Sequence, residues 1–119
     1  MKNTVQTLMD TAAADTELLQ VLDQQGDHFA LSRDVEFVLR APSEERASLV
    51  AGFFNDLHYG DATVGEHEGL YSVFVTVHTT IEQPVILSIS GFITCISQLY
   101  DMEYDGWSCA PQISRAIAN

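Results

Sequence analysis

A single ten-residue segment with strictly alternating apolar positions places the strongest constraint on the fold. The segment is Leu70–Thr79, and the apolar side chains on one of its faces are Tyr71, Val73, Val75 and Val77. Successive side chains of a β-strand point to opposite faces, so this spacing predicts a strand with one buried face. Asp61–His67 has the pattern of a shorter strand, and the stretch from Gly65 to Gly69 supplies a turn. We therefore predict a β-hairpin.

Five further segments carry helical or extended periodicity. Asp34–Arg40 alternates like a first strand, and Tyr104–Cys109 has the pattern of a short last strand. Apolar spacings of three and four residues predict one helix or two short ones from Val5 to before Gly26. The same spacings predict helices from Ser43 to Leu57 and from Val85 to Leu99.

The segment after Pro84 admits two interpretations. Its β-branched residues would suit a buried strand, but its length and the proline at its entry favour a helix. The apolar stripe expected on this helix consists of Val85, Ile89, Phe92, Ile96 and Leu99.

The order of the elements is helix, strand, helix, strand, strand, helix, strand. It is the split βαβ order of a ferredoxin-like βαββαβ sandwich, an α+β fold, preceded by a helix. We predict a four-stranded antiparallel sheet with the helices from Ser43 and Val85 on one face. Residues 1–26 would form an N-terminal helical extension, and residues 27–119 a ferredoxin-like regulatory domain. The other sheet face would be covered by the extension, by a partner or by water.

The chain is strongly acidic, with 17 Asp and Glu residues against 5 Lys and Arg and a net charge of −12. Direct nucleic-acid binding is disfavoured, because phosphates are met by clustered Lys and Arg, and Lys2 is the only lysine. An anionic membrane surface is disfavoured for the same reason. The negative electrostatic field of such a chain can attract and hold a basic protein partner. The alternative is that the charge serves only to keep a small protein in solution.

Neither secretion nor a membrane span is indicated by the sequence. The N-terminus lacks the apolar run of a signal peptide. Val85–Tyr100 is interrupted by polar residues and falls short of the ~20 residues that a span needs. Cys95 and Cys109 form no CxxC motif and are expected to be reduced thiols. We therefore expect a cytoplasmic protein.

The motifs that would carry metal binding or catalysis are incomplete. No two of the 4 histidines have the i, i+4 spacing of ligands on one helix, and residues 66–68 are expected to form an exposed hairpin tip. Asp101–Gly106 resembles the start of a calcium loop, but Gln112 stands where that loop needs a bidentate glutamate. G-x-S-x-G and phosphate-binding glycine motifs are absent. We expect no metal, no cofactor, no catalytic residue and no enzyme activity.

Aromatic and acidic residues gather between Tyr100 and Trp107. Two tyrosines and the only tryptophan stand among three acids next to a glycine, where a core strand would carry Val or Ile. Amphipathic aromatic residues are favoured as anchors of protein interfaces. The alternative is a tryptophan packed on the sheet, with the acids solvated. The candidate partner-binding residues are Asp101, Glu103, Tyr104, Asp105, Gly106 and Trp107, joined by Glu36 on the first strand.

The run E-Y-D-G-W at Glu103–Trp107 is similar to one that follows the last helix in the regulator of ribonuclease E activity B family. The chain resembles that family from about Leu18 to Ala110; the other matching stretches are Leu18–Asp27, Glu36–Ala41 and Leu57–Tyr59. The resemblance implies a ferredoxin-like sandwich in the bacterial cytoplasm that binds ribonuclease E outside its catalytic domain. It implies inhibition of RNA decay through altered degradosome composition, without catalysis. Inhibitory members carry a long acidic tail after the last strand. The corresponding segment here, residues 113–119, is short and includes Arg115.

We therefore predict a non-enzymatic acidic regulator that binds ribonuclease E, or another protein with a basic segment, through protein contacts. The acidity and the aromatic last strand are read from the residues themselves. The identity of the partner is inferred only from the resemblance. The alternative is a small-molecule-sensing ferredoxin-like domain that dimerises, which needs a pocket with a few convergent polar groups. An enzyme would need titratable residues that converge in a cleft.

Overall fold

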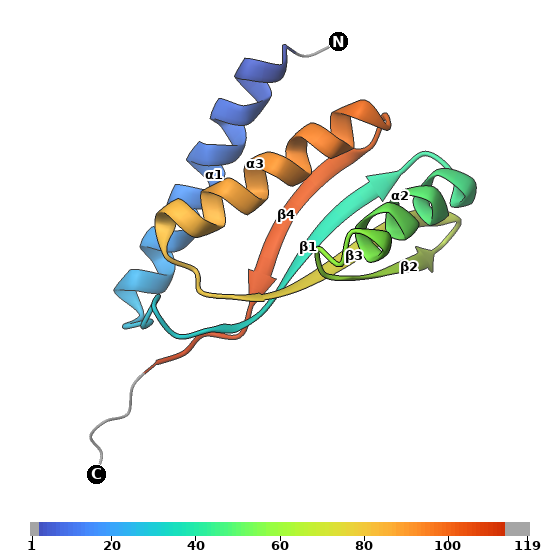
Figure 1. Ribbon diagram of the computed structural model, residues 1–119. Helices are drawn as coiled ribbons and strands as arrows, with labels where there is room; N and C mark the ends of the chain where they lie inside the picture. Colours follow the sequence, from blue (N-terminus) through green and yellow to red (C-terminus); the bar gives the residue numbers. More distant parts are fainter. Residues whose placement is uncertain (1–2, 114–119) are drawn as a thin grey trace.

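A four-stranded antiparallel sheet forms the centre of the computed structural model, which describes residues 3–113 (Figure 1). The strands are β1 (Arg33–Ala41), β2 (Asp61–His67), β3 (Leu70–Thr79) and β4 (Glu103–Cys109), in the order β2-β3-β1-β4. Helix α2 (Glu44–Asp56) connects β1 to β2, and α3 (Gln83–Leu99) connects β3 to β4. A first helix, α1 (Thr4–Gln24), precedes the sheet. This order confirms the predicted α+β fold with a βαββαβ arrangement. Arg115 lies outside the described residues.

The helices begin where the sequence offers a suitable first turn. The Asn3 side chain accepts a hydrogen bond from the backbone N–H of Val5 at 2.7 Å, and Ser43 Oγ accepts one from that of Arg46 at 3.1 Å. Pro84 lies in the first turn of α3, where a backbone N–H has no helical partner. The helix predicted after Pro84 is therefore confirmed, and the strand interpretation is wrong.

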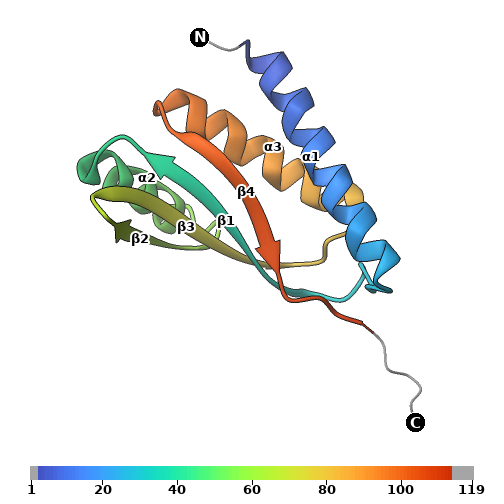
Figure 2. The same ribbon diagram turned by 180° about the vertical axis from the view of Figure 1, so that it is seen from behind.

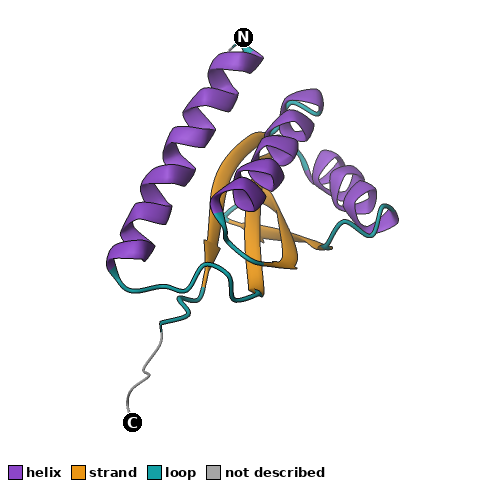
Figure 3. Cartoon of the chain, turned by 60° about the vertical axis from the view of Figure 1, so that its left-hand side comes forward, coloured by secondary structure: helices purple, strands orange, loops and turns teal. Residues whose placement is uncertain are grey.

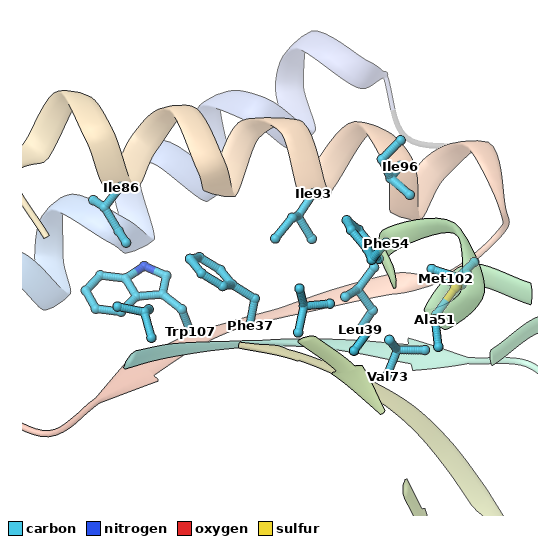
Figure 4. Close-up of a cluster of buried hydrophobic side chains, with 14 of the residues drawn as sticks. Phe37, Leu39, Ala51, Phe54, Val73, Ile86, Ile93, Ile96, Met102 and Trp107 are labelled. Carbon is cyan, nitrogen blue, oxygen red and sulfur yellow. The ribbon is translucent and has the colours of Figure 1, made fainter. Parts of the chain in front are cut away.

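The core lies between the inner face of the sheet and helices α2 and α3, as Figure 4 shows for part of it. Alternate residues of β1 and β3 point into it, as their spacing predicts. Phe54 of α2 and Phe92 of α3 have ring centroids 6.4 Å apart, so the two helices cover the same face. Fully buried core side chains include Val35, Phe37, Leu39, Val50, Phe54, Val73, Val75, Ile86 and Ile93.

The stripe that α3 buries differs from the predicted one. Its buried positions are Ile86, Ser90, Ile93, Thr94, Ile96 and Ser97, whereas Leu99 is 75% exposed. The reason is that α1 packs along α3 on the side away from α2, so α3 is covered by the sheet on one side and by α1 on another (Figures 1 and 3). Small polar residues fit between two closely packed helices: Thr94 Oγ1 lies 3.4 Å from Thr11 Oγ1 of α1.

Helix α1 packs beside α3 and leaves the outer face of the sheet uncovered. Figure 2 shows α1 running alongside α3 near β4, and Leu19 and Leu22 of α1 are buried in the core. Within residues 3–113, no helix lies on the outer face. In the same part of the chain, no helix combines the length and apolarity needed to cross a membrane.

A buried ion pair fixes the connection between α1 and β1. Arg33 Nη1 and Nη2 each donate to one Asp27 carboxylate oxygen at 2.8 Å, and the two side chains are only 3% and 0% exposed. Asp27 also accepts from the backbone N–H of Gln112 at 3.0 Å, and Arg33 donates to the backbone carbonyl of His28 at 2.8 Å. The pair therefore joins the end of α1, the start of β1 and the segment after β4.

Candidate functional site

The outer face of the sheet, which we call the open sheet face, is exposed across all four strands. Residues directly opposite each other on antiparallel strands point to the same side. Glu36 lies opposite Thr76 and Ser108, and Asp61 lies opposite Thr76, so these residues form one row across the sheet. Arg40 lies opposite Ser72 and Glu103. The open sheet face consists of Asp34, Glu36, Val38, Arg40, Asp61, Thr63, Ser72, Phe74, Thr76, His78, Glu103, Asp105 and Ser108.

Carboxylates dominate the charge of the open sheet face. Its acids are Asp34, Glu36, Asp61, Glu103 and Asp105, whereas Arg40 is the one Lys or Arg among the residues that define it. Arg40 Nη2 lies 3.3 Å from Asp105, and His78 Nδ1 lies 3.0 Å from Asp34. Half-buried Val38 and Phe74 form an apolar centre between the charged strands. The face thus combines a negative field with a small apolar patch.

The predicted partner-binding residues do not all lie together. Glu36, Glu103 and Asp105 share the open sheet face. Asp101 is 87% exposed in the turn before β4 and lies 3.8 Å from Arg46 of α2, so it sits beside the helix layer.

Gly106 lies in a β-bulge that turns β4. Its φ is +96°, and the pairing of β1 with β4 shifts between Phe37 and Leu39. Two residues, Asp105 and Gly106, therefore stand opposite the single residue Val38.

Tyr104 and Trp107 point to the inner side of the sheet and not toward the open sheet face. Trp107 is only 8% exposed, and its Nε1–H donates to Asp15 Oδ1 of α1 at 2.9 Å. The Tyr104 hydroxyl lies 2.6 Å from Ser90 Oγ of α3, and burial raises the pKa of Tyr104 above its usual value. The arrangement is the alternative considered from the sequence, a tryptophan packed on the sheet with the acids solvated. Direct partner contact by these two rings stays a prediction that this geometry does not favour.

Asp15 is a functional candidate that the sequence analysis missed. It is 4% exposed, and its Oδ2 is buried without a hydrogen-bond partner among residues 3–113. Burial raises the pKa of Asp15, and the nearby Ser90 hydroxyl and the Trp107 N–H, which favour the charged form, offset this only in part. The available signal was an acid on an apolar stripe, since Asp15 follows Leu8 by seven residues and precedes Leu19 by four.

A polar cleft of about 470 Å³, the α1–β4 cleft, opens beside Asp15. It is bounded by Thr7–Asp15 of α1, the C-terminal turn of α3 and residues 102–106. Glu103 and Asp105 lie where the cleft meets the open sheet face. Within residues 3–113, no group of three or more His, Cys, Asp or Glu side chains is arranged to hold a metal ion.

Replacing Asp15 with asparagine is expected to raise the free energy of unfolding at pH 7 by about 1 kcal/mol. Asparagine keeps an oxygen acceptor for Trp107 and removes a charge that burial disfavours. Because the folded-state pKa of Asp15 is raised, the buried negative charge lowers the stability of the wild type above that pKa. This loss of stability disappears as the pH falls to 3.8, the pKa in the unfolded state. Urea unfolding of both proteins between pH 7 and pH 4 should show the difference shrinking with acidification. A variant less stable than the wild type at pH 7 would contradict this account of Asp15.

Comparison with known proteins identifies a protein family. The family model described as "Regulator of ribonuclease activity B" matches residues 12–109, from the middle of α1 to the end of β4. No curated protein matches the chain.

Proposed function

The chain belongs to the regulator of ribonuclease activity B family, and from that premise we propose that it is a non-enzymatic regulator of ribonuclease E. In this proposal it binds ribonuclease E, or a similar protein with a basic segment, in the bacterial cytoplasm and slows RNA decay. The observation that carries the proposal is the family match over residues 12–109, which spans all four strands, α2 and α3. A regulatory role also agrees with a sequence that carries no nucleophile elbow or phosphate-binding motif.

The open sheet face is the proposed site of contact. Its carboxylates complement a basic segment, and the field of a chain with net charge −12 would steer such a segment toward it. Val38 and Phe74 would supply the short-range apolar contact that charge alone does not give.

The residues predicted from the sequence take different parts in this proposal. Glu36, Glu103 and Asp105 would contact the partner, and Asp101 would add to the field from the neighbouring turn. Tyr104, Gly106 and Trp107 would hold β4 in the shape that presents those acids. The face lies within residues 27–119, the proposed regulatory domain, and residues 1–26 would support it as a helical extension.

Replacing Glu36 and Glu103 together with glutamine is expected to weaken binding to purified ribonuclease E about tenfold at low salt. Exposed charges of this kind contribute modestly one by one, and two of them account for roughly that factor. The measurement is a titration by calorimetry or biolayer interferometry at low and at physiological ionic strength. The affinity of the wild type should fall as the salt concentration rises, because screening at 0.15 M limits the range of interactions between exposed charges to about 8 Å.

Asp56→Asn is the matched control for this experiment. Asp56 is an exposed acid at the end of α2, in the helix layer and away from the open sheet face. Its neutralisation should leave the affinity unchanged. Equal affinities of the double variant and the wild type at low salt would place the interface elsewhere on the molecule.

The second candidate function is small-molecule sensing, and the α1–β4 cleft is the observation that favours it. A small-molecule-sensing domain needs a pocket with convergent polar groups, and the α1–β4 cleft is of that kind.

A further inference from the structure

We propose that the α1–β4 cleft binds an organic cation, with the Asp15 carboxylate holding its ammonium or guanidinium group. The inference goes beyond regulation of a ribonuclease. The cleft shares Glu103 and Asp105 with the open sheet face, but the proposed contact with Asp15 lies outside that face.

The first argument is that the charge of Asp15 exceeds what its structural contact needs. Trp107 Nε1–H uses only Oδ1, and an asparagine oxygen would accept that hydrogen bond without burying a charge. Buried carboxylates in proteins are normally paired with a cation or fully hydrogen-bonded. Here Oδ2 is buried with no partner among residues 3–113, and burial raises the pKa of the group. A bound cation would supply the missing donor.

The second argument is the chemistry of the cleft wall. Asp10, Glu103 and Asp105 join Asp15 in the lining, which includes no Lys or Arg among the described residues. Hydroxyl groups of Thr7, Thr11 and Tyr104 add further oxygen atoms. Ammonium and guanidinium groups carry several N–H donors and no acceptor, so they match a wall rich in oxygen acceptors.

The third argument is size. The volume of about 470 Å³ lies in the range of small-molecule pockets, far above that of one metal ion. The acids are also not gathered as metal ligands are, since no metal-type group of three occurs within residues 3–113. Spread carboxylates suit an extended cation, either a free amine or an arginine or lysine side chain of a bound protein.

The fluorescence of Trp107 provides a direct probe. It is the only tryptophan of the chain and is hydrogen-bonded to the carboxylate in question. We would titrate the protein with spermidine, with L-argininamide and with a short blocked peptide containing one arginine, and confirm binding by calorimetry. The same blocked peptide with citrulline in place of arginine is the neutral analogue and tests the need for charge. We expect saturable binding of at least one cation and none of the neutral analogue.

Asp15→Asn is expected to weaken that binding about thirtyfold or more, as loss of one partner of a buried charge pair does. Ala14→Leu tests the site without touching a carboxylate, because Ala14 is exposed and lines the cleft. It should weaken binding about tenfold by filling space. Ala13→Leu is its matched control, since Ala13 is exposed on the same helix outside the lining, and Asp56→Asn, at the end of α2 and outside the lining, controls for the overall charge. Both controls should bind as the wild type does.

The outcomes separate the source of the cation from the existence of the site. Binding of a free amine that Asp15→Asn abolishes supports a small-molecule site, and binding of the arginine peptide alone supports a site for a partner's side chain. Thermal melts establish that each variant is folded. No saturable response to any of the three cations, or equal affinities of Asp15→Asn and the wild type, would overturn the proposal. Neither result would bear on ribonuclease binding by the open sheet face.

Discussion

Trp107→Ala is expected to lower the free energy of unfolding by about 3–5 kcal/mol, the range for truncating a large buried aromatic residue. Trp107 lies directly opposite Phe37 on the inner face of the sheet and beneath Ile86 of α3, with its ring nitrogen pointing away from the sheet (Figure 4). The variant leaves a cavity at this position and also removes the N–H that Asp15 accepts. The melting temperature should fall by roughly 10–20 °C. Guanidinium and thermal unfolding followed by circular dichroism would measure both quantities.

Trp107→Phe is the control for this prediction. It keeps most of the apolar volume and loses the hydrogen bond to Asp15, so we expect a smaller loss of about 1–2 kcal/mol. If Trp107→Ala melted within about 2 °C of the wild type, the ring would not be part of the core. Its role as a partner anchor, predicted from the sequence, would then become the better explanation.

Arg33→Met is expected to cost about 3–5 kcal/mol, because it leaves the Asp27 carboxylate buried without its cation. Arg33 binds both Asp27 oxygens and the carbonyl of His28, so the loss also loosens the connection between α1 and β1. The double variant Arg33→Met/Asp27→Leu removes both charges and should recover much of the stability. Urea unfolding of the three proteins measures these differences.

The exposed pair between Arg40 and Asp105 is the matched control. Its side chains are 61% and 48% exposed, so Arg40→Met should change the free energy of unfolding by less than about 1 kcal/mol. A comparable loss from Arg33→Met and Arg40→Met would show that burial does not decide the strength of these pairs.

The pH dependence of the buried pair has a definite sign. Burial by itself would raise the pKa of Asp27, but hydrogen bonds from Arg33 and Gln112, with the positive charge of Arg33, lower it below its usual value. Its contribution to stability is therefore present above 3.8, the unfolded value, and is lost as the pH falls through the lowered folded pKa. The pKa of Asp15 is raised, so acidification removes a destabilising charge there. Protonation of the two buried acids therefore changes the free energy of unfolding in opposite directions.

Local sequence patterns, which include periodicity, segment length and helix-entry residues, were sufficient to predict the secondary structure. The hairpin strands β2 and β3 have the predicted bounds, and β1 extends its predicted range by one residue at each end. These elements are predictable because the pleat of a strand and the caps of a helix depend on neighbouring residues. The buried face of α3 was not predictable in the same way, because it depends on α1, which approaches from a distant part of the sequence.

The acids of the candidate site were visible in the sequence, but their grouping was not. Glu36 and Glu103 lie 67 positions apart and share the open sheet face only through the pairing of β1 with β4. Asp15 and Trp107, 92 residues apart, meet because α1 packs beside α3. A carboxylate on an apolar stripe could have marked Asp15, but its partner could not be named without the tertiary structure.

The α+β order, the acidity and the family of this protein could be read from the amino-acid sequence, because each depends on residue identity and short-range spacing. The side of the sheet that each of the E-Y-D-G-W residues occupies became clear from the pairing of β4 with β1. In a regular strand Tyr104 and Trp107, three residues apart, would point to opposite faces. The bulge at Gly106, whose φ of +96° favours glycine, inserts one extra residue and turns both rings inward, leaving the neighbouring acids on the open sheet face.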